Sequence, residues 1–235
     1  MTDPDAARTV DWVLIATKTY DVEGTTRWLE RLVGPETRVA VLQNGVEHVA
    51  RFAPFVRTNH IVPVVVDIPA ERRAPGNIVQ RRDGWMKVPR GPNGAAFAAL
   101  FQSPGLAVST DDDWTSVAWA KLAVNCAGAV NGLTGKPAGI VAKAEVAALM
   151  HGLVVECLTV GRTEGAMLSD DLPNRILAET RASPPDSVNS LLADRLAGRP
   201  MEWDARNGVI ARLGAAHGIP TPLNTMAATL LAALK

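Results

Sequence analysis

The chain has 235 residues, of which 47% are hydrophobic and 20% charged, and its 24 basic side chains balance its 24 acidic ones. This length and composition allow one large buried core or two modest ones. The balanced charge gives no electrostatic reason to expect nucleic acid or an anionic membrane as a partner.

The polar N-terminal residues and the two isolated cysteines predict a cytoplasmic protein. The first eleven residues are mostly polar, and we expect no apolar run of the roughly 18 to 20 residues that cross a bilayer. Cys126 and Cys157 form no metal-binding or redox motif. The sequence allows one disulfide between the two cysteines, but a chain of this size does not need it. Reduced thiols are therefore expected.

The first half of the chain predicts short buried strands that alternate with helices. Residues 10–16 are almost wholly apolar, as expected of a strand buried on both faces, and residues 21–32 have helical spacing. Residues 37–42 predict a second buried strand, so the order indicates parallel strand–helix–strand units. The other elements expected here are helices at 46–52 and 95–101 and strands at 60–66, 76–80, 85–88 and 105–109, with turns over 69–94.

After the acidic residues 111–113, only Ala- and Leu-rich helical patterns follow. Capping Asp and Ser residues and breaks at Gly and Pro separate them. The expected helices span 114–130, 143–163, 172–183, 187–197, 201–217 and 222–234. The predicted fold is therefore α/β plus all-α, with a truncated Rossmann-like parallel sheet over residues 1–110 and a helical substrate or dimerisation domain over residues 111–235.

The strand at 10–16 has the composition of a central strand, yet only nine mostly polar residues precede it. In a right-handed doubly wound sheet, earlier strands supply part of the cover of such a strand. We therefore expect either that the first strands of the sheet are missing from this sequence or that a partner chain covers the edge.

Several polar residues are candidates for a site. Lys18 and Asn44 follow the two predicted parallel strands at their carboxyl ends, where open α/β sheets bind ligands. Lys121 and Asn125 share one face of an otherwise apolar helix, where a lysine can act as a general acid or base. The alternatives are a solvated lysine, an Asn-Gly turn and a helix face that borders solvent.

Four stretches in series resemble the ketopantoate reductase (2-dehydropantoate 2-reductase) family. They read DWVLIATKTYD, VAVLQNGVE, WAKLAVNCAGAVNGLTG and SLLADRLAGRPMEWDARNGVIARLGAAHGIPTPLN. The resemblance covers essentially the whole chain. It implies a Rossmann domain followed by a helical domain, and NADPH-dependent reduction of 2-dehydropantoate or a related 2-keto acid in pantothenate biosynthesis. It also implies a small-molecule partner and allows a homodimer.

The resemblance assigns roles to individual residues. Lys121 matches the lysine that donates a proton to the ketone oxygen, and Glu202 matches the acidic residue that assists it. Asn44, Asn125 and Ser190 match residues that bind the carboxylate and hydroxyl of the substrate. The residues expected at the cofactor are Lys18, Asn44 and Glu202, and no metal is expected. Without the resemblance, Ser190 and Glu202 would be ordinary surface or capping residues.

Some positions depart from the family pattern. The serine motif of the family reads Ser-Ser-Met-Leu-Gln-Asp, whereas residues 189–194 read Asn-Ser-Leu-Leu-Ala-Asp, and Met201 stands where Thr is common. One turn beyond Asn125 the family has asparagine, whereas here Ala129 occupies that place and Asn131 follows. These departures leave room for an opine or another 2-keto acid as the substrate.

The sequence contains no GxGxxG, the loop that lets a pyrophosphate approach a helix N-terminus. By the resemblance, Met1 falls just before the fourth or so strand of the family. Met1 is thus expected to be internal to a longer protein, unless the lineage has lost cofactor binding. NADPH binding by these residues is expected to be weak. The alternative function is a non-catalytic relative that binds a small acid or mediates dimerisation.

Overall fold

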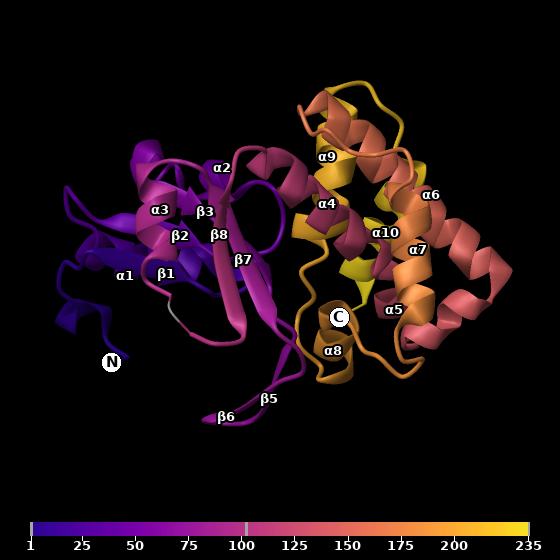
Figure 1. Cartoon of the computed structure of the whole chain (residues 1–235), viewed down its shortest axis with the longest axis horizontal. Coiled ribbons are helices and arrows are strands. Elements are labelled where there is room, and N and C mark those ends of the chain that lie inside the picture. The colour runs from indigo at the N-terminus through magenta and orange to yellow at the C-terminus, as the bar shows by residue number, and fades with distance from the viewer. Residues whose placement is uncertain (1, 102, 235) are drawn as a thin grey trace. The chain divides into compact units, whose positions relative to one another are not determined.

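The computed structural model describes residues 2–101 and 103–234, and the chain divides into two compact units after Val117. The first unit, indigo to magenta in Figure 1, carries the strands, and the second is built from helices. The fold is α/β plus all-α, with a Rossmann-like parallel sheet followed by a helical C-terminal part, as predicted. The domain boundary expected near residue 110 stays a prediction.

The first sheet has parallel strands in the order β1–β2–β3, which span Trp12–Ile15, Arg38–Val41 and Ile61–Pro63. Helix α1, Val22–Leu32, connects β1 to β2, and helix α2, His48–Phe52, lies between β2 and β3. This is the strand–helix–strand order that the sequence predicts for parallel units.

Apolar side chains cover both faces of β2. Val39 and Val41 pack with Leu29 of α1 and Phe52 of α2, whereas Ala40 belongs to a second cluster on the other face. Val39, Ala40 and Val41 are each 0% exposed. Because successive side chains of a strand point to opposite faces, β2 is buried on both, as predicted.

The prediction that the first strand is buried on both faces is wrong. Among the described residues, β1 pairs only with β2 and forms the edge of the sheet. Ile15 is 4% exposed, but Leu14 on the other face is 43% exposed. The apolar composition reports how well the side chains tolerate burial, whereas actual burial depends on neighbours that the composition does not specify.

The strand expected over 60–66 is two strands in different sheets. β3 ends at Pro63, and β4 spans Val65–Asp67 in a second sheet of order β4–β7–β8. β7, Gly84–Pro89, is antiparallel to β4 and parallel to β8, Leu106–Asp111. Val64 between the strands is 0% exposed, so the apolar run is continuous although the sheet is not.

A polar hairpin occupies part of the segment where turns were expected. β5, Ala70–Ala74, pairs antiparallel with β6, Asn77–Gln80. Gly76 adopts φ 75° in the turn, a left-handed conformation that favours glycine. The side chains that the structure describes in this hairpin form no buried apolar face, and the sequence of its first strand shows no apolar alternation. Helix α3, Pro92–Ala98, begins with the proline, as is common at a first helical position, and earlier than expected.

The α-helices of the helical part are shorter than the sequence patterns indicate. The helix expected over 114–130 is two helices, and the segment expected as a helix over 201–217 begins with a π-helical turn, η5, at Asp204–Gly208. The α-helices from α4 to α10 are Trp114–Ala127, Ala129–Thr134, Ala144–Thr163, Leu172–Ala182, Ser190–Leu196, Val209–Ala216 and Pro222–Ala233. The 3-10 turns η1 to η4 are Pro4–Ala6, Thr19–Asp21, Thr58–His60 and Ala138–Ala142.

Helix α6 is long and apolar enough to cross a membrane, contrary to the expectation that no run reaches that length. It packs against α7, α9 and α10. Its Glu156 accepts hydrogen bonds from the backbone N–H groups of Leu223 and Asn224, each at 2.9 Å, at the start of α10. The carboxylate thus satisfies N–H groups that a helix start leaves unpaired. Helix α6 is therefore bound into the helical unit by apolar packing and by this carboxylate.

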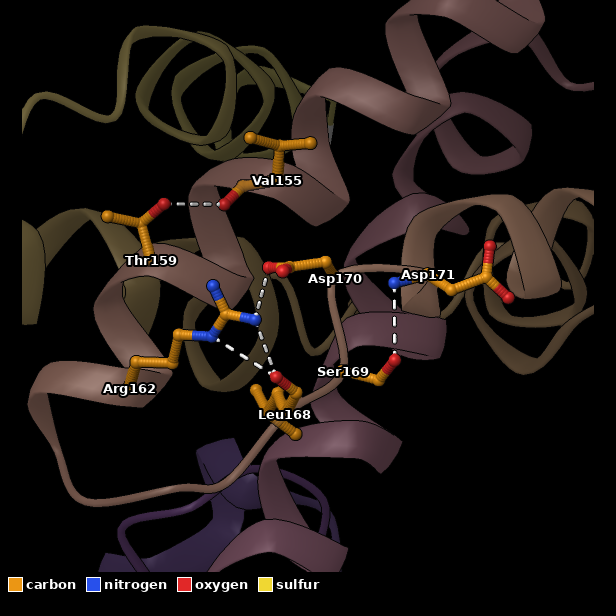
Figure 2. A network of polar contacts seen from close by, with 7 residues as sticks. All are labelled: Val155, Thr159, Arg162, Leu168, Ser169, Asp170 and Asp171. Carbon is orange, nitrogen blue, oxygen red and sulfur yellow. Dashed lines mark hydrogen bonds and ion pairs between the residues drawn. The ribbon is translucent and has the colours of Figure 1, made fainter.

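Arg162 fixes the turn from α6 to α7 (Figure 2). Its Nε and Nη2 donate to the carbonyl oxygen of Leu168 at 3.2 and 2.6 Å, and Nη2 also pairs with Asp170 at 2.6 Å. At the start of α7, the backbone N–H of Asp171 donates to Ser169 Oγ at 3.2 Å. The charged contacts hold the connecting segment against the end of α6.

Cys126 and Cys157 are free thiols, and both are buried. Burial raises the pKa of the Cys157 thiol well above its ordinary value. Because the thiolate is the reactive form, Cys157 is an unreactive core residue.

His48 of α2 is buried against Trp114, with ring centroids 5.4 Å apart. Its Nε2 lies 2.8 Å from the carbonyl oxygen of Gln43, whereas Nδ1 meets no hydrogen-bond partner among the described residues. Burial, with a further contribution from the charge of Arg51, lowers the pKa of His48 to about 4. The ring is therefore neutral in the folded protein at neutral pH.

The free energy of unfolding should fall as the pH drops from 6.5 to 4, by up to about 3 kcal/mol from this residue. The unfolded chain takes up a proton on His48 near pH 6.5, whereas the folded chain does so only near pH 4. Above pH 6.5 the ring is neutral in both states and contributes no slope. Urea denaturation of wild type and His48→Gln across this range measures the effect, and equal slopes in the two proteins would contradict it.

Candidate active site

Two candidate residues follow the carboxyl ends of β1 and β2, which meet at the same edge of the first sheet. Lys18 precedes η2 and Asn44 follows Gln43, and both are half-buried. The Gln43 side chain joins the two loops, because its Nε2 donates to Thr17 Oγ1 at 3.2 Å and to the carbonyl oxygen of Lys18 at 3.1 Å. Gly45 completes the second loop with φ 101°, a conformation that favours glycine.

Gln43 is itself held in place from α2. Arg51 Nη1 donates to Gln43 Oε1 at 3.0 Å, and Gln43 is 4% exposed. A buried amide with its oxygen and nitrogen both bonded has one orientation, so the two loops have a fixed separation. The structure places Lys18 and Asn44 at one edge, and their roles stay predictions.

Lys121 and Asn125 lie one turn apart on α4, and both are half-buried. Their helix neighbours Leu122, Ala123 and Cys126 are at most 1% exposed. The two polar side chains therefore border the apolar stripe of α4, as their spacing indicates.

A buried arginine links Ser190 to the segment that carries Glu202. Arg206 of η5 is 2% exposed, and its Nη2 donates to Ser190 Oγ at 2.8 Å. Burial lowers the pKa of the Arg206 guanidinium, and the nearby carboxylates of Glu202 and Asp194 oppose this shift. Glu202 and Asp194 are each 3% exposed. The sequence reasoning missed Arg206, although its spacing of four residues from Glu202 is a signal for pairing.

Asn207 attaches this segment to α4. Its Nδ2 donates to the carbonyl oxygen of Cys126 at 3.2 Å and to Asn224 Oδ1 at 2.9 Å. Cys126 directly follows Asn125, so the segment from Glu202 onward contacts the last turn of α4. The structure thus gathers the segments of Ser190, Glu202 and Asn125 in the helical unit.

The two asparagines that depart from the family pattern have structural contacts. Asn189 caps α8, because its Oδ1 accepts from the backbone N–H of Leu192 at 2.9 Å. Its Nδ2 donates to the carbonyl oxygen of Gly128 at 3.2 Å and to Asn131 Oδ1 at 3.0 Å. Asn131 in turn donates to the carbonyl oxygen of Lys136 at 2.9 Å. Both amides therefore hold α8 against the start of α5.

A cavity of about 230 Å³ lies elsewhere in the first unit, beside β3 and the start of α3. None of the six candidate site residues lines it. Its lining residues are Ile61, Val62, Pro63, Pro89, Arg90, Gly91, Pro92, Asn93 and Gly94.

Two family models match the chain, one for each part. The model described as "Ketopantoate reductase PanE/ApbA" matches residues 1–93, and "Ketopantoate reductase PanE/ApbA C terminal" matches residues 113–235. This chain belongs to the ketopantoate reductase family. The family membership that the four stretches predicted is thereby confirmed. The members of this family are oxidoreductases.

Relatives extend the match along nearly the whole chain. A 2-dehydropantoate 2-reductase of Caulobacter vibrioides is 59% identical over 230 residues, which cover 98% of this chain and 79% of that ketopantoate reductase. The 2-dehydropantoate 2-reductase structure from Geobacter metallireducens has a TM-score of 0.93 at 26% identity and covers 100% and 81% of the two chains. A dimeric ketopantoate reductase from Staphylococcus aureus has a TM-score of 0.88 at 22% identity, with 98% and 79% covered.

Asn189→Ala should lower the free energy of unfolding by about 1 to 3 kcal/mol, because it removes the cap of α8 and two hydrogen bonds to the α5 region. Asn189→Ser keeps a capping oxygen and loses the amide donors, so it should recover about 1 kcal/mol of that loss. Urea denaturation of the three proteins measures both effects. A serine variant as unstable as the alanine variant would argue against the capping role.

Proposed function

We propose that this chain reduces 2-dehydropantoate, or a closely related 2-keto acid, to the corresponding 2-hydroxy acid with NADPH. The observation that carries the proposal is the family match over both parts of the chain, which includes the stretches with Lys121 and Glu202. The product would be pantoate, an intermediate of pantothenate biosynthesis, and the enzyme would work in the cytoplasm.

The proposed chemistry uses Lys121 as the proton donor. NADPH, when bound, supplies a hydride to the ketone carbon. The ammonium of Lys121 would give a proton to the ketone oxygen, so the developing alkoxide becomes the hydroxyl group of the product. Glu202, a buried carboxylate, would assist this lysine by orienting it, as the family resemblance implies. Asn44, Asn125 and Ser190 would bind the carboxylate and hydroxyl oxygens of the substrate.

The chain carries residues suited to part of a site for the proposed cofactor. Lys18 and Asn44 lie at the carboxyl edge of parallel strands, where such sheets bind nucleotides. Glu202 is the third residue proposed to contact the cofactor. The 235 residues contain no GxGxxG for the pyrophosphate, so we expect weak binding by this chain.

We also propose a homodimer as the working form. The Staphylococcus aureus ketopantoate reductase with the same fold is dimeric. The balanced charge of this chain gives no reason for a nucleic-acid or membrane partner. Light scattering after size-exclusion chromatography measures the mass directly, and a monomer at micromolar concentration would contradict the proposal.

Titration of the purified chain with NADPH, followed by fluorescence, should show weak or undetectable binding. Any residual affinity should fall further in Lys18→Met, which loses the proposed cofactor contact. The matched control is Lys136→Met, a lysine in the helical unit that has no proposed role in cofactor binding. Micromolar or tighter binding by wild type would contradict the expectation.

Lys121→Ala should lower kcat/KM for 2-dehydropantoate by about 10²- to 10⁴-fold, the usual contribution of a general acid. Loss of NADPH absorbance measures the rate, with NADPH in large excess to offset weak binding. Lys136→Ala is the control for loss of one positive charge. An unchanged rate in Lys121→Ala would remove this residue from catalysis, and a wild type that reduces no 2-keto acid would refute the proposed function.

A further inference from the structure

A buried guanidinium lies directly behind the hydroxyl of Ser190. Ser190 is the first residue of α8 and is exposed, whereas Arg206 is 2% exposed. Arg206 Nη2 and Ser190 Oγ are 2.8 Å apart. Because a guanidinium has donors and no acceptor, Ser190 Oγ must be the acceptor in this hydrogen bond.

The direction of this hydrogen bond determines what Ser190 offers to a ligand. A hydroxyl that accepts from a guanidinium keeps its own hydrogen for a second contact. The neighbouring positive charge polarises the O–H group and makes it a stronger donor. The Ser190 hydroxyl therefore donates best to a ligand oxygen that approaches from solvent. A carboxylate oxygen is the strongest acceptor of this kind.

The charges around Arg206 keep it ionised and in place. The carboxylates of Glu202 and Asp194 are close enough to favour its charged form, and Asp194 also pairs with Arg199 at 2.9 Å. Arg206 Nε is buried, and the part of the chain that the structure describes gives it no hydrogen-bond partner. A buried charge with an unmade hydrogen bond costs stability, so its retention calls for a role.

We propose that Arg206 is a positioning residue that makes Ser190 a hydrogen-bond donor to the carboxylate of the substrate. Arg206 acts through Ser190, because its own side chain is shielded from solvent. The inference rests on the proposed function and deepens it: the site selects 2-keto acid anions over their neutral esters through this pair.

A double-mutant cycle on substrate affinity tests the proposal. The variants are Ser190→Ala, Arg206→Met and the double variant, and calorimetry measures binding of 2-dehydropantoate at a fixed concentration of NADP⁺, which cannot reduce the ketone. Each single variant should weaken binding about tenfold or more, as for a lost hydrogen bond to a charged group. The double variant should be no weaker than Ser190→Ala, and Arg206→Lys should recover part of the loss. Equal effects of Arg206→Met with and without Ser190 would indicate a merely structural role and overturn the proposal.

A second measurement decides the matter if Arg206→Met does not fold. The methyl ester of 2-dehydropantoate keeps the carbonyl acceptors and loses the negative charge. Wild type should prefer the acid, and Ser190→Ala and Arg206→Lys should both reduce that preference. An unchanged preference in both would overturn the inference and leave the proposed function standing. A wild type that binds neither acid nor ester would refute the proposed function itself, and this inference with it.

Discussion

The arrangement of the helical unit depends on one buried amide, that of Asn207. It is 0% exposed and bonds both to the carbonyl oxygen of Cys126 and to Asn224, which Glu156 of α6 holds through two further contacts. Asn207 Oδ1 has no hydrogen-bond partner among the described residues, but the bonds of Asn207 Nδ2 and of Asn224 join α4, α6, α10 and η5 to one another. The candidate residues of this unit take their places from it.

A buried side-chain amide has a comparable role in the first unit. Gln43 lies at the end of β2, where its amide spans to the loop after β1. In the first unit the buried amide directly precedes the candidate Asn44, and in the helical unit Asn207 bonds to Cys126, which directly follows the candidate Asn125. The amides at 43 and 207 therefore position candidate residues and are not proposed to touch the substrate. Their loss would loosen the geometry of the candidate site without removing a reacting group.

Much of the fold follows from the sequence, and the exceptions have physical reasons. β2 and α1 were predicted because hydrophobic periodicity directly reports their burial. The edge position of β1 and the separation of β3 from β4 at Val64 were not predicted, because they depend on which strands lie alongside. Four of the six candidate residues came from their places on predicted strands and a helix, whereas Ser190 and Glu202 came from the resemblance alone. Arg206 was missed because its importance arises from a contact with Ser190 that only the folded chain creates.

The π-helical turn at Asp204–Gly208 has a consequence for sequence length in this region. A π turn accommodates one residue more than an α turn, and each residue rotates a helix by about 100°. Deletion of a single residue here would convert the π turn to an α turn, which changes the directions of the side chains within the turn, Arg206 among them. Because Arg206 reaches Ser190 from inside this turn, the number of residues between Trp203 and Val209 is constrained together with their identity, so insertions and deletions should be less tolerated than most substitutions.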